Sequence, residues 1–386
     1  MSGPAATLRV ATLITRLEGG AGQLALRGAA ALDQGAFATT IIAGSGALLG
    51  EAAAAGLEVI VEPALGRAID PRRDLRTLNA LAGLLRERSF DVVHTHTAKA
   101  GVLGRVAARR AGVPRIVHTY HGFPFHEFQS RARRGAYVAV ERRLGRITDV
   151  ALCVGTAVSV EAIRRGLVAP DRVRTIGVAT AAVPDAGPDP EARERARRVL
   201  GVPVDGTVIG AVGRLTYQKA PEDFVAAIRA LGRPGVTGVW IGGGELAARI
   251  GRLAARRPVP RVLLAGERAD VPDLLPAFDV FLLPSRYEGL PTAVVEAMAC
   301  GIPVVATAVN ATCDVVVPGE TGLLVPPGRP DLMAEAVGYL LDHPAVAVRM
   351  TEAARSRLGH RFEISAVRST LMEAYGVAST LPALST

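Results

Sequence analysis

The chain has 386 residues, too many for one ordinary domain and enough for two of about 180 each. Hydrophobic residues make up 49%, and the 45 basic residues exceed the 36 acidic ones by 9, which suits anionic ligands such as nucleotide diphosphates, phospholipid head groups or nucleic acid. The three cysteines form no disulfide framework or CxxC pair, and no apolar run reaches the ~18 residues of a membrane-spanning helix, so we expect a protein of the reducing cytoplasm.

The chain opens with a predicted strand, a glycine turn and a predicted helix. The strand is Leu8–Thr15, and the helix is Gln23–Leu32. Gly19 and Gly20 lie on the loop between them, where glycines let backbone N–H groups approach an anion or a sugar. A dinucleotide site is a poor match, because GGAG lacks the G-x-G-x-x-G spacing.

Five of the seven histidines lie within or just after two predicted strands, 91–94 and 115–119: His94, His96, His118, His121 and His126. Three interpretations stay open. A metal site is one, since His94 and His96 share a strand face, although no Asp or Cys is spaced to complete it. Core histidines bonded to the backbone are another, which suits His94 and His118. An active-site loop is the third, because His121 stands at the carboxyl end of a strand.

The segment Ser130–Ile147 is an amphipathic helix by its spacing and carries six arginines. A solvated basic helix is one interpretation. The other is contact with a membrane surface or a lipid phosphate.

The second half begins after a linker rich in proline and aspartate, Val183–Pro190. Its first strand, Thr207–Val212, is followed by Arg214 and Lys219. Two cations on a loop at a strand end can neutralise a diphosphate leaving group. The alternative is a pair of ordinary surface cations.

The stretch 279–307, DVFLLPSRYEGLPTAVVEAMACGIPVVAT, reads as strand, loop, helix and strand, a parallel crossover unit. In such units the loop after the first strand and the start of the helix form the ligand crevice, where N–H groups suit a phosphate. Glu288 is expected at the loop tip facing sugar hydroxyls, and Glu296 is expected to be buried on the helix, where a ribose diol would supply donors. Alternatively, Glu296 only complements the helix dipole.

The segment EGLPTAVVEAMACGIPVVAT closely resembles the Glu-x7-Glu signature of retaining glycosyltransferase family 4, whose members have the GT-B fold. The resemblance covers essentially the whole chain and implies an α/β protein with two doubly wound Rossmann-like domains facing each other across a cleft. The expected parts are an acceptor-side domain at 1–182, a linker and first helix at 183–200, a nucleotide-sugar domain at 201–361, and a helix at 362–386 that crosses back to the first domain.

The resemblance also implies roles for particular residues. Glu296 would hold the nucleotide ribose, Glu288 would contact the donor sugar, and Arg214 and Lys219 would bind the diphosphate. His121 would lie near the reacting sugar. The remaining donor-binding residues would be Gly19, Gly20, Gly213, Gly243, Arg268, Val271, Gly289, Leu290, Pro291 and Thr292, and the acceptor-side candidates are His96 and His126.

One segment departs from the family pattern. Residues 310–313, Asn-Ala-Thr-Cys, stand where Gly-Gly-hydrophobic-Pro is common, which puts the donor preference in doubt.

The implied activity is transfer of a sugar, with retention, from a UDP- or GDP-sugar to a hydroxyl acceptor. Cell-surface polysaccharide, glycolipid or secondary-metabolite synthesis would use such an enzyme. No cofactor, no metal and no nucleic-acid partner are expected. The acceptor could be lipid-linked, with the Arg131–Arg146 segment touching the inner face of the membrane. A nucleotide-sugar epimerase or hydrolase, or a non-enzymatic nucleotide-sugar-binding protein, is the alternative.

Overall fold

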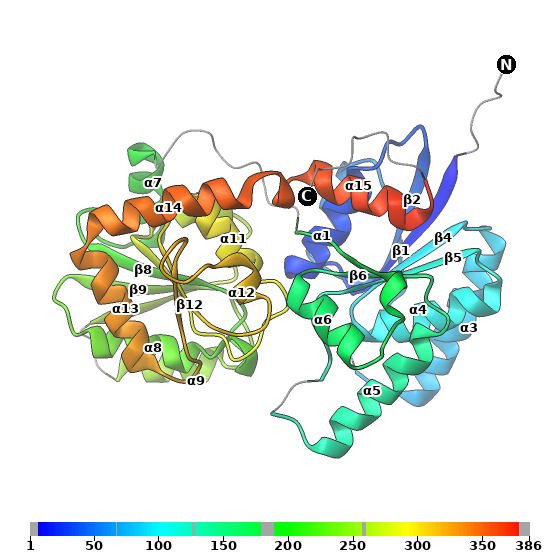
Figure 1. The fold of residues 1–386 in the computed structure, drawn as a ribbon, viewed down its shortest axis with the longest axis horizontal. Helices are drawn as coiled ribbons and strands as arrows, with labels where there is room; N and C mark the ends of the chain where they lie inside the picture. Colours follow the sequence, from blue (N-terminus) through cyan, green and yellow to red (C-terminus); the bar gives the residue numbers. More distant parts are fainter. Residues whose placement is uncertain (1–6, 67, 126–127, 179–188, 257–259, 378–386) are drawn as a thin grey trace. The chain divides into compact units, whose positions relative to one another are not determined.

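The computed structural model describes residues 7–66, 68–125, 128–178, 189–256 and 260–377, and its contacts divide the chain into two compact units (Figure 1). The first unit comprises Met1–Ala179 and His360–Thr386, and the second comprises Thr180–Gly359. Each unit is a parallel sheet covered by helices and is described by itself below.

The first unit contains a seven-stranded parallel sheet in the order β3-β2-β1-β4-β5-β6-β7. Its strands are β1 (Leu8–Arg16), β2 (Phe37–Ser45), β3 (Glu58–Val61), β4 (Val92–His96), β5 (Arg115–Tyr120), β6 (Val150–Cys153) and β7 (Val173–Thr175). The α-helices are α1 (Gly19–Ala30), α2 (Leu49–Ala54), α3 (Pro71–Glu87), α4 (Ala98–Ala111), α5 (Arg131–Gly145), α6 (Thr156–Arg164) and α15 (Ile364–Tyr375). The central strands β4 and β5 are almost wholly buried, as is usual where helices cover both faces of a parallel sheet.

The second unit contains a six-stranded parallel sheet in the order β10-β9-β8-β11-β12-β13. Its strands are β8 (Thr207–Val212), β9 (Val236–Ile241), β10 (Arg261–Gly266), β11 (Val280–Leu283), β12 (Val304–Thr307) and β13 (Leu323–Val325). The α-helices are α7 (Pro190–Leu200), α8 (Pro221–Leu231), α9 (Ala247–Ala255), α10 (Val271–Leu274), α11 (Thr292–Ala299), α12 (Thr312–Val315), α13 (Pro330–Asp342) and α14 (Pro344–Leu358). Its core packs Trp240 and Phe224 edge to face, with ring centroids 5.4 Å apart.

Both sheets reverse their strand order at one place, between β1 and β4 in the first unit and between β8 and β11 in the second. In doubly wound sheets ligands bind outside the carboxyl ends of the strands at this switch point. The fold therefore directs attention to the loops after these four strands.

Two local predictions differ from the structure. Helix α1 begins at Gly19, so Gly19 and Gly20 form the first turn of a helix instead of a loop. Strand β4 continues to His96, two residues beyond the predicted end, which places that histidine inside the sheet.

The buried face of α5 contains a charged residue, Glu141, besides apolar ones such as Leu144. Val140 is 39% exposed, whereas Glu141 is buried. Glu141 pairs with Arg105 at 2.8 Å and accepts a hydrogen bond from Tyr120 Oη at 2.9 Å. The helix is therefore fixed to α4 and β5 by a buried ion pair as well as by apolar packing.

Candidate active site

In the second unit, the loops after β8 and β11 meet through an ion pair. The Nζ atom of Lys219 lies 2.6 Å from Oε1 of Glu288, and both side chains are largely buried. Glu288 also accepts hydrogen bonds from the Ser285 hydroxyl and, at 3.3 Å, from Nε2 of Gln218. Its backbone N–H donates to Oδ1 of Asn310 at 3.2 Å. The carboxylate of Glu288 is thus held in one position by donors from two loops.

Arg286 ties the same two loops together. Its guanidinium lies 4.3 Å from the centre of the Tyr217 ring and donates to the Tyr217 carbonyl at 2.7 Å. Its backbone N–H donates to the Gln218 carbonyl at 2.8 Å, and its Nη2 lies 3.2 Å from Glu222. Cation–π contact, ion pair and backbone bonds together fix the segment that carries Lys219.

A turn of three glycines after β9, Gly242–Gly244, packs directly against the loop that follows β8. A Cβ on Gly242 would meet the Gly213 carbonyl oxygen at 2.2 Å, and Gly244 has φ +148° with the Leu215 backbone 2.6 Å from such a Cβ. Only glycine allows this approach. The turn therefore packs against Gly213. The alkyl chain of Lys219 also lies close to Gly213, 3.3 Å from the position that a Cβ would take there.

Both glutamates lie on the predicted elements, Glu288 on the loop between β11 and α11 and Glu296 on α11, but the burial of each side chain differs from the expectation. Glu288 is 7% exposed instead of standing at an open loop tip, because it has several donors around it. Glu296 is half-buried instead of buried, on α11 one turn before Cys300. Burial and the charge of Glu296 raise the pKa of the Cys300 thiol to about 11, while Arg355 on α14 opposes that shift. Helix α11, which carries Glu296, packs against α14.

Other predicted donor residues spread along the same edge of the sheet. Arg214 is exposed. Burial raises the pKa of Tyr287, and the positive charge of Arg214 acts in the opposite direction. In the turn between β11 and α11 three predicted residues are buried, Gly289, Leu290 and Pro291, and Thr292 is the first residue of α11.

The loop after β10 lies one strand further away. The side chain of Arg268 is exposed and pairs with Asp270 at 2.5 Å, and Val271 starts α10. Gly243, at the end of β9, lies against the side chain of Glu267. Gly243 is joined to the loop that carries Lys219, because its carbonyl accepts a hydrogen bond from the N–H of Leu215 at 2.6 Å.

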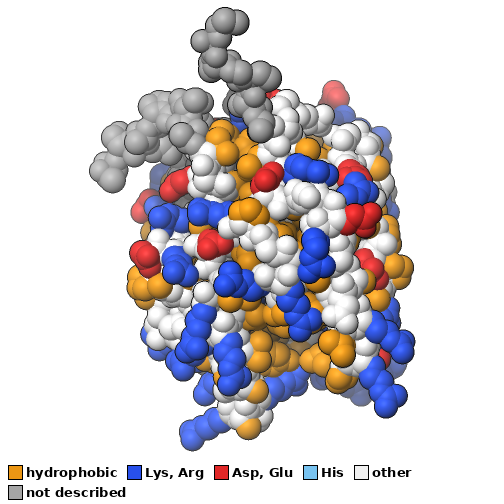
Figure 2. All heavy atoms as spheres, turned by 90° about the vertical axis from the view of Figure 1, so that its right-hand side faces the viewer, with side chains coloured by type: hydrophobic (Ala, Val, Ile, Leu, Met, Phe, Trp, Pro, Cys, Tyr) orange, Lys and Arg blue, Asp and Glu red, His pale blue; other side chains and the backbone are white. Residues whose placement is uncertain are grey.

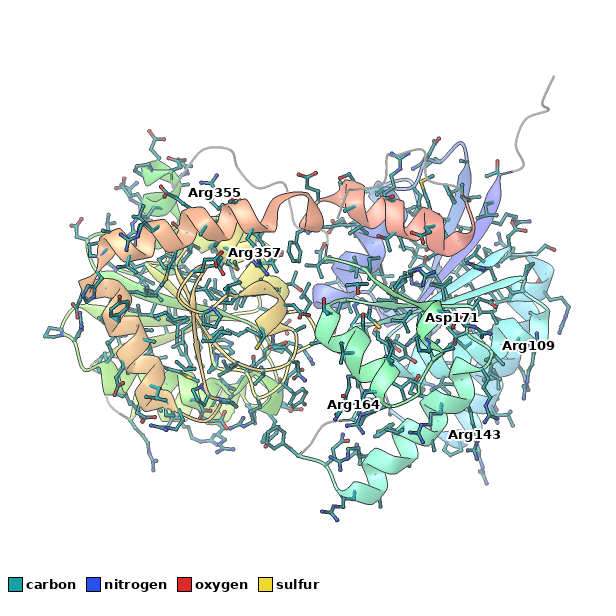
Figure 3. All side chains as sticks on the ribbon, viewed as in Figure 1. Arg109, Arg143, Arg164, Asp171, Arg355 and Arg357 are labelled. Carbon is teal, nitrogen blue, oxygen red and sulfur yellow. The ribbon has the colours of Figure 1, made fainter. Side chains whose placement is uncertain are left out.

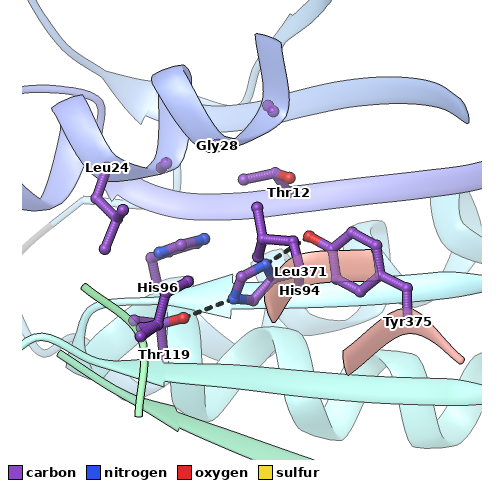
Figure 4. Close-up of a pocket in the computed structure, with 11 residues that line it drawn as sticks. Thr12, Leu24, Gly28, His94, His96, Thr119, Leu371 and Tyr375 are labelled. Carbon is purple, nitrogen blue, oxygen red and sulfur yellow. Dashed lines mark hydrogen bonds between the residues drawn. The ribbon is translucent and has the colours of Figure 1, made fainter. Parts of the chain in front are cut away.

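In the first unit, the histidines form a buried hydrogen-bonded cluster on β4 and β5. Nδ1 of His94 lies 2.7 Å from Oη of Tyr375 on α15, and its Nε2 lies 2.7 Å from Oγ1 of Thr119 (Figure 4). His118 bonds to the Thr95 hydroxyl at 2.9 Å. His94 and His118 are core histidines, as one interpretation predicts. The partners of His94 are side-chain hydroxyls, whereas His118 bonds to the hydroxyl and to the backbone of Thr95.

His96 and His121 form a direct pair at the carboxyl ends of β4 and β5. Nδ1 of His96 lies 2.9 Å from Nε2 of His121. His96 is 2% exposed, whereas His121 is partly exposed. The structure therefore brings these two predicted site residues together, and His126 lies outside the described residues.

Burial keeps all four histidines neutral at pH 7. It lowers the pKa of His94 to about 3 and that of His121 to about 4, and it lowers the pKa values of His96 and His118 well below the ordinary value. Among the described residues no group of three or more His, Cys, Asp or Glu side chains is arranged to hold a metal ion.

Strained backbone conformations occur beside the His96–His121 pair and beside the Lys219–Glu288 pair. Four non-glycine residues in the described ranges have a positive φ: Ser89, Thr97, Ala220 and Asn310. Thr97 follows His96, Ala220 follows Lys219, and Asn310 bonds to the Glu288 backbone. Such conformations cost of order 1–3 kcal/mol each and cluster at functional sites.

The chain contains only two lysines, and each is in a largely buried ion pair. Lys219 belongs to the second unit, and Lys99, near the start of α4, lies 2.6 Å from Asp74 in the first.

Several residues of these networks could not be found from the sequence. Thr119 and Tyr375 carry no motif, and Tyr375 lies 281 positions from its partner His94. Ser285 and Arg286 flank the recognised signature, yet only the folded loops show that they hold Glu288 and the Tyr217 segment.

Comparison with known proteins relates both halves of the chain to glycosyltransferases. The family profile "Glycosyltransferase Family 4" matches residues 18–178, and "Glycosyl transferases group 1" matches residues 192–357. The chain is 31% identical over 310 residues to UDP-Gal:alpha-D-GlcNAc-diphosphoundecaprenol alpha-1,3-galactosyltransferase of Escherichia coli, covering 78% of this chain and 79% of that protein. It is 32% identical to 2-deoxystreptamine glucosyltransferase of Streptomyces kanamyceticus, covering 73% and 76%.

Solved structures agree on the fold. HepE of Anabaena, crystallised with UDP and glucose, superposes with a TM-score of 0.84 at 21% identity, covering 96% of this chain and 99% of that one. WaaG, a glycosyltransferase of lipopolysaccharide biosynthesis, gives a TM-score of 0.74 at 17% identity, covering 95% and 100%. These matches identify the two doubly wound sheets as the GT-B fold. The chain therefore belongs to glycosyltransferase family 4, and the protein is a glycosyltransferase.

Proposed function

We propose that the enzyme transfers a hexosyl group from a UDP-sugar to a hydroxyl acceptor, with retention at the anomeric carbon and without a metal ion. The relative from Escherichia coli is named for UDP-galactose, and HepE was crystallised with UDP-glucose as well as with UDP. These names support uridine as the base, and they leave galactose and glucose as the first donors to test.

The Lys219–Glu288 pair at the switch point of the second unit is the observation that carries the proposal. The ammonium group of Lys219 has three donors, of which Glu288 takes one, so a diphosphate could take the others. Arg214, exposed on the same loop, would share the charge of the leaving group. Glu288 would accept from the sugar hydroxyls, and Glu296 would accept from the ribose diol.

In the first unit, His121 is the group assigned to the reacting sugar. It is neutral and partly exposed, and its Nε2 is occupied by His96. His126 remains an acceptor-side candidate from the sequence.

An epimerase or a hydrolase would consume the donor without an acceptor, and a non-enzymatic binding protein would not consume it. UDP release from UDP-galactose and UDP-glucose should therefore be measured with and without lipid-linked and soluble sugar acceptors. Release that depends on an acceptor supports transfer. Equal release without any acceptor favours hydrolysis, and no release despite donor binding favours the binding protein.

Replacement of Glu296 and replacement of Glu288 should change the affinity for free UDP by different amounts. Glu296→Gln removes the charge proposed for the ribose and should weaken UDP by about 1.5–3 kcal/mol, the range of hydrogen bonds to charged groups. Glu288→Gln should change UDP affinity little, because UDP has no sugar for that side chain to contact, but should reduce donor turnover. Calorimetry with UDP measures both, and equal losses of affinity would contradict the assignment of Glu288 to the sugar.

We also propose that the acceptor is lipid-linked and that the α5 region meets an anionic membrane surface. Exposed arginines cover α5 and its neighbours, among them Arg109, Arg143 and Arg164 (Figure 3). Figure 2 shows Lys and Arg side chains predominating over Asp and Glu toward the bottom of the view. Exposed apolar side chains accompany them: Phe128 (48%), Val140 (39%), Val160 (56%) and Ile163 (40%). No helix of the described residues is long and apolar enough to cross a membrane.

Charge removal on α5 should weaken vesicle binding by about 1 kcal/mol for each arginine near the surface. The test variant replaces Arg131, Arg133 and Arg143 with glutamine. A matched control of equal charge replaces three exposed arginines, Arg249 and Arg252 of α9 and Arg256, the residue that follows α9. Co-sedimentation with anionic vesicles at low salt should fall only in the α5 variant, and equal binding of the two variants would refute the α5 surface.

A further inference from the structure

The pair formed by His96 and His121 restricts the form in which His121 can meet a substrate. Nε2 of His121 is occupied by Nδ1 of His96 at 2.9 Å, so Nδ1 is the nitrogen that this contact leaves for a sugar. Since both rings are neutral, one nitrogen in the contact carries the shared proton and the other accepts it. The position of that proton decides whether Nδ1 of His121 is a donor or an acceptor.

The far side of the His96 ring decides between these two forms. Its Nε2 atom is buried and has no hydrogen-bond partner among the residues that the structure describes. The ring lies in the wall of a pocket that is lined by Leu24 and Leu371 and also by Thr12 and Thr119 (Figure 4). If His121 donated to His96, Nε2 of His96 would carry an unpaired buried N–H. If His96 donates, Nε2 is an unpaired acceptor. Among buried backbone groups, an unpaired acceptor is more common than an unpaired N–H, and we apply the same preference to the imidazole ring.

We propose that His96 is a positioning residue that donates from Nδ1 to Nε2 of His121 and thereby keeps His121 as the neutral Nδ1–H tautomer. His121 then presents a hydrogen-bond donor to an oxygen of the substrate and does not act as a base. Free histidine in water favours the opposite tautomer, with the proton on Nε2, so the protein has to impose this one. The inference rests on the proposed function only for the role of His121 in the reaction, not for its tautomer.

The tautomer can be read directly in the full-length protein without any ligand. In protein labelled with ¹⁵N-histidine at neutral pH, protonated and bare ring nitrogens of a neutral histidine resonate far apart, and a His121→Ala variant assigns the signals. Nδ1 of His121 should be protonated and Nε2 bare. A bare Nδ1 in the wild-type protein would overturn the proposal, whether or not any variant folds.

Three variants then test the role of His96. His96→Asn keeps an N–H donor at the position of Nδ1 and should retain the His121 tautomer. His96→Leu removes the donor and should move His121 toward the Nε2–H form. His118→Asn alters a neighbouring buried histidine that bonds to Thr95, and should leave the His121 signals in place. An unchanged His121 tautomer in His96→Leu would overturn the proposal.

Kinetics with UDP-galactose or UDP-glucose, whichever is turned over, separate positioning from folding. His96→Leu should lower kcat about tenfold to hundredfold with little change in the donor KM, as expected when a supporting group is lost. His96→Asn should recover most of that loss, and equal losses in both variants would overturn the positioning role. Wild-type turnover in His121→Ala would instead remove His121 from the reaction while leaving the tautomer result intact.

Discussion

Lys219→Ala is expected to lower kcat/KM for the donor about thirtyfold to a thousandfold. This range corresponds to a loss of about 2–4 kcal/mol when one preorganised charge is removed from a leaving group. The ammonium group has no substitute of the same kind in the second unit, because the only other lysine is Lys99. Arg214→Ala should have an effect of similar size if both cations share the diphosphate.

The Lys219 variant also leaves the buried carboxylate of Glu288 without its cation, which costs about 3–5 kcal/mol of stability in comparable pairs. Lys99→Ala is the matched control, since Lys99 makes an equally short and similarly buried ion pair with Asp74 in the other unit. Both variants should melt at lower temperature, but only Lys219→Ala should lose turnover at a temperature where both are folded. Turnover within threefold of wild type would show that Lys219 does not act on the leaving group.

Acid should destabilise the first unit by roughly 4 kcal/mol between pH 7 and pH 5 through His94 and His121 alone, and His96 and His118 should add to that loss. Burial holds the folded pKa values of His94, His96, His118 and His121 below the unfolded value of about 6.5. Below that value the unfolded chain binds more protons than the folded one, so stability falls as the pH falls. One histidine that stays neutral in the fold contributes about 2 kcal/mol over this interval.

Hydrogen exchange resolved by mass spectrometry can follow each unit separately. Peptides from β4 and β5 should lose protection steeply between pH 7 and pH 5 after correction for the intrinsic exchange rate. Fluorescence of Trp240, the single tryptophan, reports the second unit and should show a much weaker pH dependence. His94→Phe should reduce the pH dependence of the first unit by one proton, whereas replacing the exposed His343 should not. If the stability of the first unit did not change with pH, the four histidines would take up protons in the folded state as readily as in the unfolded chain.

The sequence predicted those parts of the fold whose signal is local. The prediction of β8 is correct residue for residue, because the apolar run Thr207–Val212 ends at Gly213. The predicted start of α1 is wrong, because the sequence indicates a loop at Gly19 and Gly20, whereas both residues belong to the first helical turn. Helix and strand ends depend on tertiary contacts, which local composition does not contain.

The candidate site was predictable as a set of residues but not as an arrangement. Lys219 and Glu288 were both identified, yet their ion pair was not, because it depends on how the loops after β8 and β11 meet. Likewise, His96 and His121 were assigned different roles, and only the register of β4 with β5 places one against the other. Motifs name the chemical groups, whereas the topology of the sheet decides which groups touch.

The two ion-paired lysines have a consequence for proteolysis. A protease specific for lysine can cut this chain of 386 residues at only two peptide bonds, after Lys99 and after Lys219. Each bond lies in a different unit beside a largely buried side chain, so cleavage requires that unit to open locally. The rate at each bond therefore reports the opening free energy of its own unit. A ligand that binds only the second unit would slow the cut after Lys219 and leave the cut after Lys99 unchanged, so one gel would show which unit the ligand binds.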